Sequence, residues 1–162
     1  MIQLDAHADL RESYIGNKHS HACAMKRCLE VLPEKKILQV GIRSGTKEEF
    51  QFMNDNNQLV NFLPGGNTQE LKKALLPYSN SPIYLTIDLD WFDPSLLAGT
   101  GTPEPGGFFW NDFEEILKTL KDFRIVASDI VELSPEIDKS GVSSIVAAKV
   151  LRSLILSSEN MQ

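Results

Sequence analysis

Several scarcities in the 162-residue sequence exclude whole classes of protein. No apolar run approaches the ~18 residues of a membrane-spanning helix, so we expect no membrane partner. Only two cysteines are present, Cys23 and Cys28, and their spacing in a predicted helix points the two side chains in different directions. A disulfide framework is therefore not expected. Two buried, reduced thiols suit a cytoplasmic protein.

Positive charge is also scarce, because 16 lysines and arginines stand against 22 aspartates and glutamates. Nucleic acids and anionic membranes need basic patches, so neither is expected as a partner. The apolar content of 42% and the charged content of 23% are ordinary for a globular protein, and the length suffices for one domain with a real core.

Apolar runs alternate with amphipathic stretches along the chain. Strands are predicted over 2–4, 36–42, 58–62, 82–88 and 123–131, and helices over 20–32, 46–53, 67–78, 111–121 and 140–156. Thr46 with Glu49 has the spacing of a capping box, and Asn67 and Asn111 are the predicted caps of two later helices. The alternation predicts an α/β fold with three layers and a mainly parallel sheet covered by helices on both faces.

Polar side chains follow the predicted strands. Asp5, His7 and Asp9 follow the first strand, and Asp88, Asp90 and Asp93 follow the strand over 82–88. Arg43, Ser44 and Glu132 follow two other strands. Since ligands of open α/β sheets bind beyond the carboxyl ends of the strands, we expect these groups to converge.

Asp5, Asp9, Asp88 and Asp90 with His7 make four carboxylates and one imidazole. Such a set suits a hard or borderline divalent ion, manganese better than zinc. Converging carboxylates would repel one another unless cations lay between them, and a pair of ions ~3.5–4 Å apart would meet that need.

Three other interpretations concern parts of this pattern. An isolated Asp-x-His-x-Asp triplet most often consists of solvent-exposed side chains or helix caps. The run "DLDWFD" resembles the start of an EF-hand loop, but Phe92 and Asp93 stand where an oxygen ligand and glycine are required. Aspartate-nucleophile phosphatases carry Thr or Val two residues after the second aspartate, where this sequence again has Phe92.

Four segments together resemble the ureohydrolases, the binuclear manganese enzymes that include arginase and agmatinase: "LDAHADLR", "SHACAMKR", "TIDLDWFDPSLLAGTGTPEPGG" and "DIVELSPEIDKSGVSSIVAAKVL". The wording is most similar to the agmatinase branch. The resemblance implies an arginase-like α/β/α fold, and an amidinohydrolase that releases urea and an amine from a small guanidino substrate with two Mn²⁺ ions.

The resemblance also implies a ligand set. Asp5 and Asp88 match the carboxylates that bridge the two metals, His7 and Asp90 match further ligands of one metal, and Asp9 matches a ligand of the other.

Two further roles follow from the same resemblance. His21 matches a proton shuttle to the leaving amine, and Glu132 matches the acid that pairs with the guanidinium. His19 matches nothing and is expected to be exposed. The loop 100–107 is expected at the site mouth, with simple turn chemistry as the alternative, and Asp93 is interpreted as a turn or supporting acid rather than a ligand.

The family has one more motif, Gly-Gly-Asp/Glu-His-Ser, whose histidine binds the same metal as Asp9. Only four residues precede Asp5, and the motif is absent. We therefore expect residues 1–162 to form a single ureohydrolase domain with its N-terminal strands missing, acting as a homo-oligomer or with an N-terminal partner fragment. The alternative is a non-catalytic ureohydrolase remnant or interaction subunit lacking one metal ligand.

Loss of that imidazole predicts unequal metal affinity. The ion held by Asp5, His7, Asp88 and Asp90 keeps its protein ligands, whereas the ion held by Asp5, Asp9 and Asp88 lacks one. Calorimetric titration with manganese should show one tighter site, with an affinity at least ~10–100-fold higher than the other. Two sites of equal affinity would contradict this assignment.

Overall fold

The computed structural model describes residues 1–32 and 36–159. Five parallel strands form one sheet in the order β3-β2-β1-β4-β5, so that β1 lies at its centre. The strands are β1 (Ile2–Leu4), β2 (Leu38–Val40), β3 (Leu59–Val60), β4 (Ile83–Asp88) and β5 (Ile125–Val131). The prediction of a parallel α/β sheet is confirmed.

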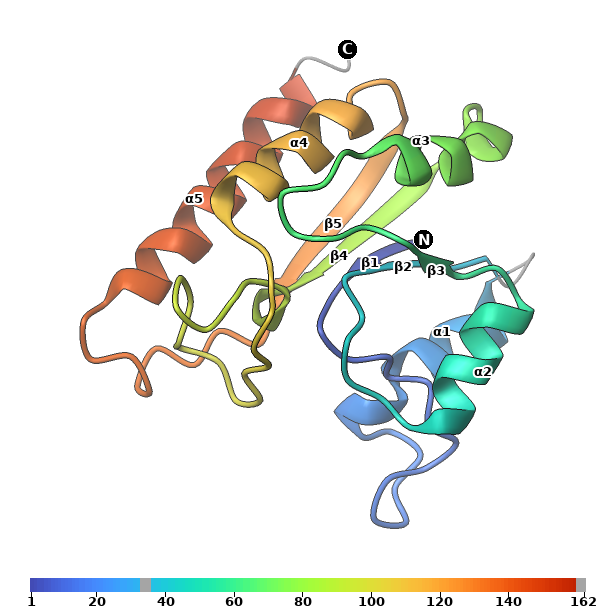
Figure 1. The fold of residues 1–162 in the computed structure, drawn as a ribbon, viewed down its shortest axis with the longest axis horizontal. Coiled ribbons are helices and arrows are strands. Elements are labelled where there is room, and N and C mark those ends of the chain that lie inside the picture. Colours follow the sequence, from blue (N-terminus) through green and yellow to red (C-terminus); the bar gives the residue numbers. More distant parts are fainter. Residues whose placement is uncertain (33–35, 160–162) are drawn as a thin grey trace.

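The helices separate into two groups (Figure 1). One group contains α1 (Ala24–Val31) and α2 (Lys47–Asp55), and the other contains α3 (Gln69–Leu75), α4 (Trp110–Leu120) and α5 (Val142–Glu159). Short 3₁₀ turns, η1 (His21–Cys23), η2 (Leu76–Tyr78) and η3 (Leu89–Trp91), join these elements. No helix among the described residues combines the length and hydropathy needed to cross a membrane.

The alternation of side chains along β1 divides the core in two. Ile2 and Leu4 are buried in the larger apolar cluster, which includes side chains of α3, α4 and α5. The smaller cluster includes Met25 and Leu29 of α1 and Met53 of α2. Helices therefore lie on both faces of the sheet, as predicted.

Strand β2 is shorter than the predicted 36–42 because of Gly41. This glycine adopts φ +96°, which L side chains rarely adopt, and a Cβ atom there would collide with the Trp91 indole and the Phe108 ring. Those two rings stack with centroids 4.3 Å apart, and Phe62 stacks on Phe108 at 5.2 Å. The sheet ends at Gly41 so that the chain can pass this aromatic stack.

One of the three predicted helix starts is confirmed and two are corrected. Thr46 and Glu49 form the predicted reciprocal capping box of α2. Helix α3 begins one residue beyond Thr68, and Asn67 instead accepts a hydrogen bond from the Gln69 amide at 3.1 Å. Asn111 lies inside α4, whose first turn is held by Asp112.

Asp112 explains the second correction, since its carboxylate accepts from the amides of Phe109 at 2.8 Å and Gly65 at 2.7 Å. The charged acceptor at the helix N-terminus is favoured over the neutral amide of Asn111.

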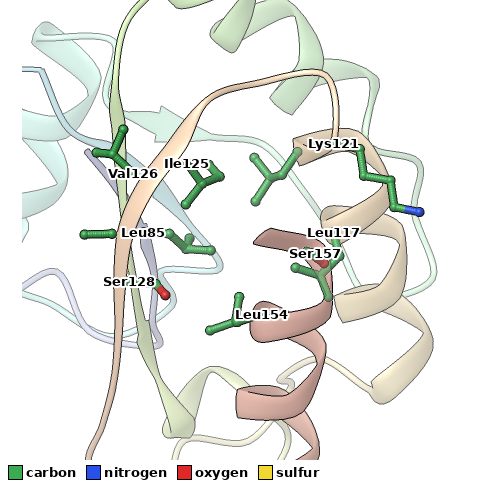
Figure 2. A pocket seen from close by; sticks show the side chains of 10 residues that line it. Leu85, Leu117, Lys121, Ile125, Val126, Ser128, Leu154 and Ser157 are labelled. Carbon is green, nitrogen blue, oxygen red and sulfur yellow. The ribbon is translucent and has the colours of Figure 1, made fainter. Parts of the chain in front are cut away.

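The helices leave part of the sheet uncovered. Strand β5 is largely exposed, whereas the central strand β1 is buried throughout, and Val126 on β5 is 53% exposed. Ile145 and Leu151 on α5 are also exposed. A shallow pocket of about 100 Å³ opens beside β5, where Leu85 and Ile125 of the strands face Leu117 and Leu154 of the helices (Figure 2).

This open edge predicts self-association of the chain. An unpaired, apolar strand edge is a template for another chain, so the sedimentation coefficient should rise with protein concentration. Val126→Lys should weaken that rise by placing a charge on the edge, whereas Ile15→Lys, at a loop residue that is 88% exposed, should leave it unchanged. Sedimentation velocity would contradict the prediction if the unmodified chain stayed monomeric over the whole concentration range.

Candidate metal centre and active site

The carboxyl ends of β1 and β4 bring the two sequence motifs together. Leu4 pairs in register with Ile87, so that Asp5 and Asp88 come next on adjacent parallel strands. His7 continues beyond β1 and forms a single parallel bridge with Ser44, which follows β2. The predicted convergence at one edge of the sheet is therefore present.

Asp5, His7 and Asp90 form the tightest cluster of potential ligands among the described residues, with one ligand atom from each lying within 4.8 Å of the others. His7 Nδ1 lies 2.8 Å from Asp90 Oδ2 and 3.7 Å from Asp5 Oδ1. Asp5 and Asp90 are almost fully buried and His7 is half-buried. Asp9 and Asp88 lie outside this cluster.

A tight turn explains how Asp88 and Asp90 both reach the edge. Asp88 is the N-cap of η3, and its Oδ1 accepts from the Asp90 amide at 2.9 Å. The turn directs the Asp90 side chain back toward β1, where its Oδ1 accepts from the Ala6 amide at 3.1 Å. The Asp-x-Asp spacing thus brings both carboxylates to the edge of the sheet, because Asp88 caps the turn on which Asp90 lies.

The other predicted residues line a pocket of about 430 Å³ at this edge. Its lining includes His7, Asp9, His21, Asp88, Asp90 and Glu132. Asp5 lines an adjoining pocket that shares Asp9, His21, Asp88 and Glu132 with the first. The structure therefore brings all seven predicted site residues to one region.

Two of these residues have an unusual backbone. Asp9 has φ +53° and Glu132 has φ +64°, in the left-handed region that favours glycine. Such conformations cost about 1–3 kcal/mol each and cluster at functional sites. Glu132 directly follows the last residue of β5. Its side chain lies beside Gly101, since a Cβ atom added to that glycine would be 3.8 Å from Glu132 Oε2.

His21 begins η1, lines the pocket and is exposed. The Tyr14 ring meets it edge to face with centroids 5.8 Å apart, and the Arg11 guanidinium lies 4.9 Å from the Tyr14 ring centroid. His19 is exposed, as expected, and does not line either pocket.

The sequence located Arg43 at a strand end but did not predict its role, which is to fasten the loop 100–107 to the site. Its guanidinium donates to the carbonyl oxygens of Asp90 and Glu104, both at 2.8 Å, and of Pro105 at 3.2 Å. A lone arginine after a strand carries no signal of such carbonyl contacts, because they connect segments that are distant in sequence.

Asp93 holds the same loop from the other side. Its Oδ2 accepts from the amides of Gly106 and Gly107, each at 3.0 Å, which agrees with its interpretation as a turn acid. The loop lines the pocket through Gly101 and Thr102, as predicted, and Thr102 Oγ1 donates to Asp90 Oδ2 at 3.4 Å.

Burial and mutual repulsion perturb the carboxylates. Burial, together with the charges of Asp5 and Asp90, raises the pKa of Asp88 to about 10. Burial and the charge of Asp5 raise the pKa of Asp9 to about 8, and burial raises the pKa of Asp5 to about 6.

His7 and Asp90 behave as an ion pair. The carboxylates of Asp5 and Asp90 raise the pKa of His7 to about 10, Asp90 being the nearer of the two. Burial opposes ionisation of Asp90, but its hydrogen bonds with His7 and with the Ala6 amide lower its pKa below the ordinary value.

These residues fit a divalent cation. The oxygen-rich donor set with one imidazole matches the preference of manganese and similar ions, and a cation would relieve the repulsion that raises the pKa values of Asp5, Asp9 and Asp88. Asp5, His7 and Asp90 would hold one ion. Asp9 and Asp88, which line the same pocket, offer oxygen donors for a second.

A parallel sheet with carboxylates and histidines gathered at its carboxyl edge is typical of α/β proteins that bind their ligands beyond the strand ends. Comparison with known families narrows this class, because the pattern of the Arginase family matches residues 1–157. The chain belongs to the Arginase family.

Comparison with individual relatives gives the same family. The chain is 34% identical over 158 residues to an agmatinase of Halalkalibacterium halodurans, covering 96% of this chain and 54% of that protein. It superposes on the agmatine ureohydrolase of Thermoplasma volcanium with a TM-score of 0.74 at 35% identity, covering 98% of this chain and 54% of that one. For an arginase from Medicago truncatula the TM-score is 0.70 at 30% identity, with 94% and 49% coverage.

The chain spans about half the length of the curated relatives it matches. Residues 1–157 of this chain, which match the family, include the ligand cluster, the pocket and every predicted site residue.

The pKa values predict how pH affects the metal-free chain. Asp5, Asp9, Asp88 and His7 all have raised pKa values, so that the folded state binds more protons than the unfolded state. The free energy of unfolding should therefore fall as pH rises from about 4, the unfolded aspartate value, through the folded values. In chelator, the melting temperature should be lower at about pH 8.5 than at about pH 5.5.

Manganese should reverse that trend, because its ligands bind in their deprotonated forms. Asp88→Asn is the control, since it removes the carboxyl group with the most strongly raised aspartate pKa and should flatten the metal-free pH dependence. A metal-free melting temperature that rises over this interval would refute the electrostatic description.

Proposed function

We propose that the chain supplies the catalytic half of a manganese-dependent ureohydrolase that converts an agmatine-like guanidino compound to urea and an amine. The observation that carries this proposal is the shared pocket, in which His7, Asp9, Asp88 and Asp90 lie with His21 and Glu132. The relatives with agmatinase names support the substrate class. The Arginase family match supports the reaction.

Two manganese ions, when bound, would lower the pKa of a water nucleophile and provide a template for the reacting groups. Asp5, His7 and Asp90 would hold one ion, and Asp9 and Asp88 would contribute to the other. The acidic pocket complements a cationic substrate and favours its encounter with the site.

Glu132 orients the substrate. A guanidinium group presents a planar fork of N–H donors that pairs with a carboxylate through two parallel hydrogen bonds. Glu132 lies in the pocket with Asp88, directly beyond the end of β5. The strained backbone at Glu132 fixes where this carboxylate enters the pocket.

His21 is the proton donor to the leaving amine. It is exposed, belongs to the short turn η1 and lines the same pocket as Glu132. Imidazole is the side chain most often used as a general acid or base in enzymes. The ring of Tyr14 packs edge to face against it.

A pair of histidine substitutions tests the proposal. His21→Ala should lower the rate of urea release from agmatine about 10²–10⁴-fold, the usual contribution of a general acid, while manganese binding is retained. His19→Ala is the matched control, since His19 is exposed nearby but lies outside both pockets, and it should leave the rate unchanged.

Colorimetric urea measurement with manganese in excess gives the readout. Equal effects of the two substitutions would remove the role of His21. Failure to release urea from agmatine or any other guanidino compound, even when the chain is supplied with an N-terminal partner fragment, would overturn the proposed function.

A further inference from the structure

Two glutamines are buried directly beneath the ligand cluster. Gln3 of β1 is 1% exposed and Gln39 of β2 is 0% exposed, and the two residues pair in register. They point away from the core face that contains Ile2 and Leu4. Gln3 precedes Asp5 by two positions, so their side chains lie on the same face of the strand.

The two amides form a chain of hydrogen bonds that ends at Asp5. Gln39 Nε2 donates to Gln3 Oε1 at 2.7 Å and to the Ala8 carbonyl at 2.8 Å. Gln3 Nε2 donates to Asp5 Oδ2 at 2.6 Å and to the His7 carbonyl at 3.3 Å. Carbonyl and carboxylate oxygens only accept, so this arrangement fixes which end of each amide faces the site.

The pair is arranged at a cost to stability. Gln39 Oε1 is buried without a hydrogen-bond partner among the described residues. A buried acceptor without a partner is destabilising. Packing alone therefore does not explain why amides occupy these positions.

We propose that Gln3 and Gln39 are positioning residues for metal binding, which hold the Asp5 carboxylate in its ligating orientation. This inference rests on the proposed function. Asp5 Oδ1 accepts from the His7 amide at 2.5 Å and Asp5 Oδ2 accepts from Gln3, so both oxygens are held before any ion arrives. Gln39 in turn fixes the Gln3 amide, because it occupies the Gln3 oxygen.

The arrangement also sets the direction of the remaining lone pairs. Each carboxylate oxygen that accepts one hydrogen bond keeps a further lone pair, and a fixed carboxylate plane fixes the direction of these lone pairs. Hydrogen-bond partners that orient metal ligands typically change metal affinity 10–100-fold. The amide pair extends this orientation into the interior of the sheet, where side chains cannot move freely.

Substitution by methionine tests the inference, because methionine has nearly the length and volume of glutamine but cannot donate. In Gln3→Met/Gln39→Met, calorimetric titration should show the manganese dissociation constant of the tighter site raised about 10–100-fold. The melting temperature of the metal-free variant should fall, because the Asp5 carboxylate and the Ala8 carbonyl lose their donors. A purely structural role would change the melting temperature and leave the affinity alone.

Gln58→Met is the matched control, since Gln58 is also a buried glutamine, 3% exposed, but lies outside this chain of hydrogen bonds. It should bind manganese as the unmodified chain does. Gln39→Met alone provides a second reading, with a smaller loss of affinity because Gln3 keeps its contact with Asp5 but loses its anchor.

The outcomes are distinguishable. If the unmodified chain binds manganese and both the double variant and Gln39→Met bind it equally well, the positioning role is overturned while the proposed function stands. If the unmodified chain binds no manganese, the proposed function falls and this inference falls with it.

Discussion

Repulsion between buried carboxylates at the carboxyl edge of the sheet is the constraint on which the rest of the site depends. Asp5, Asp9 and Asp88 all have raised pKa values, because burial and their neighbours disfavour the charged forms. Among these four carboxylates, only Asp90, which is paired with His7 at 2.8 Å, has a lowered pKa. Parallel strands force this crowding, since their ends meet at the same edge. A site that holds so much negative charge together is organised for cations.

The surroundings of the site keep these carboxylates in place. Asp88 caps the turn that returns Asp90 to β1, and Arg43 and Asp93 fasten the loop 100–107 from two sides. Beneath the edge, Gln3 holds Asp5 from inside the sheet. The backbone and its hydrogen bonds therefore define the site before substrate or metal contributes. Groups that are fixed in place before the reaction are the basis of preorganised catalysis.

Much of this architecture could be predicted from the sequence, because it depends on local patterns. Alternating apolar runs located all five strands, and the polar residues after them located the edge where Asp5 and Asp88 meet. The parts that could not be predicted depend on contacts between distant segments. Gly41 ends β2 early because Trp91 and Phe108 pass close by, and Asp112 begins α4 partly by binding Gly65. The roles of Arg43 and Gln39 likewise appear only when separate strands and loops are brought together.

We propose that the motifs around Asp5 and Asp88 form a two-metal centre. Anomalous diffraction at the manganese absorption edge, from crystals grown with Mn²⁺, tests this proposal most directly. We expect a strong peak among Asp5, His7 and Asp90, and a weaker one about 3.5–4 Å away toward Asp9 and Asp88. Crystals that show manganese elsewhere on the surface and no anomalous density between these side chains would contradict it.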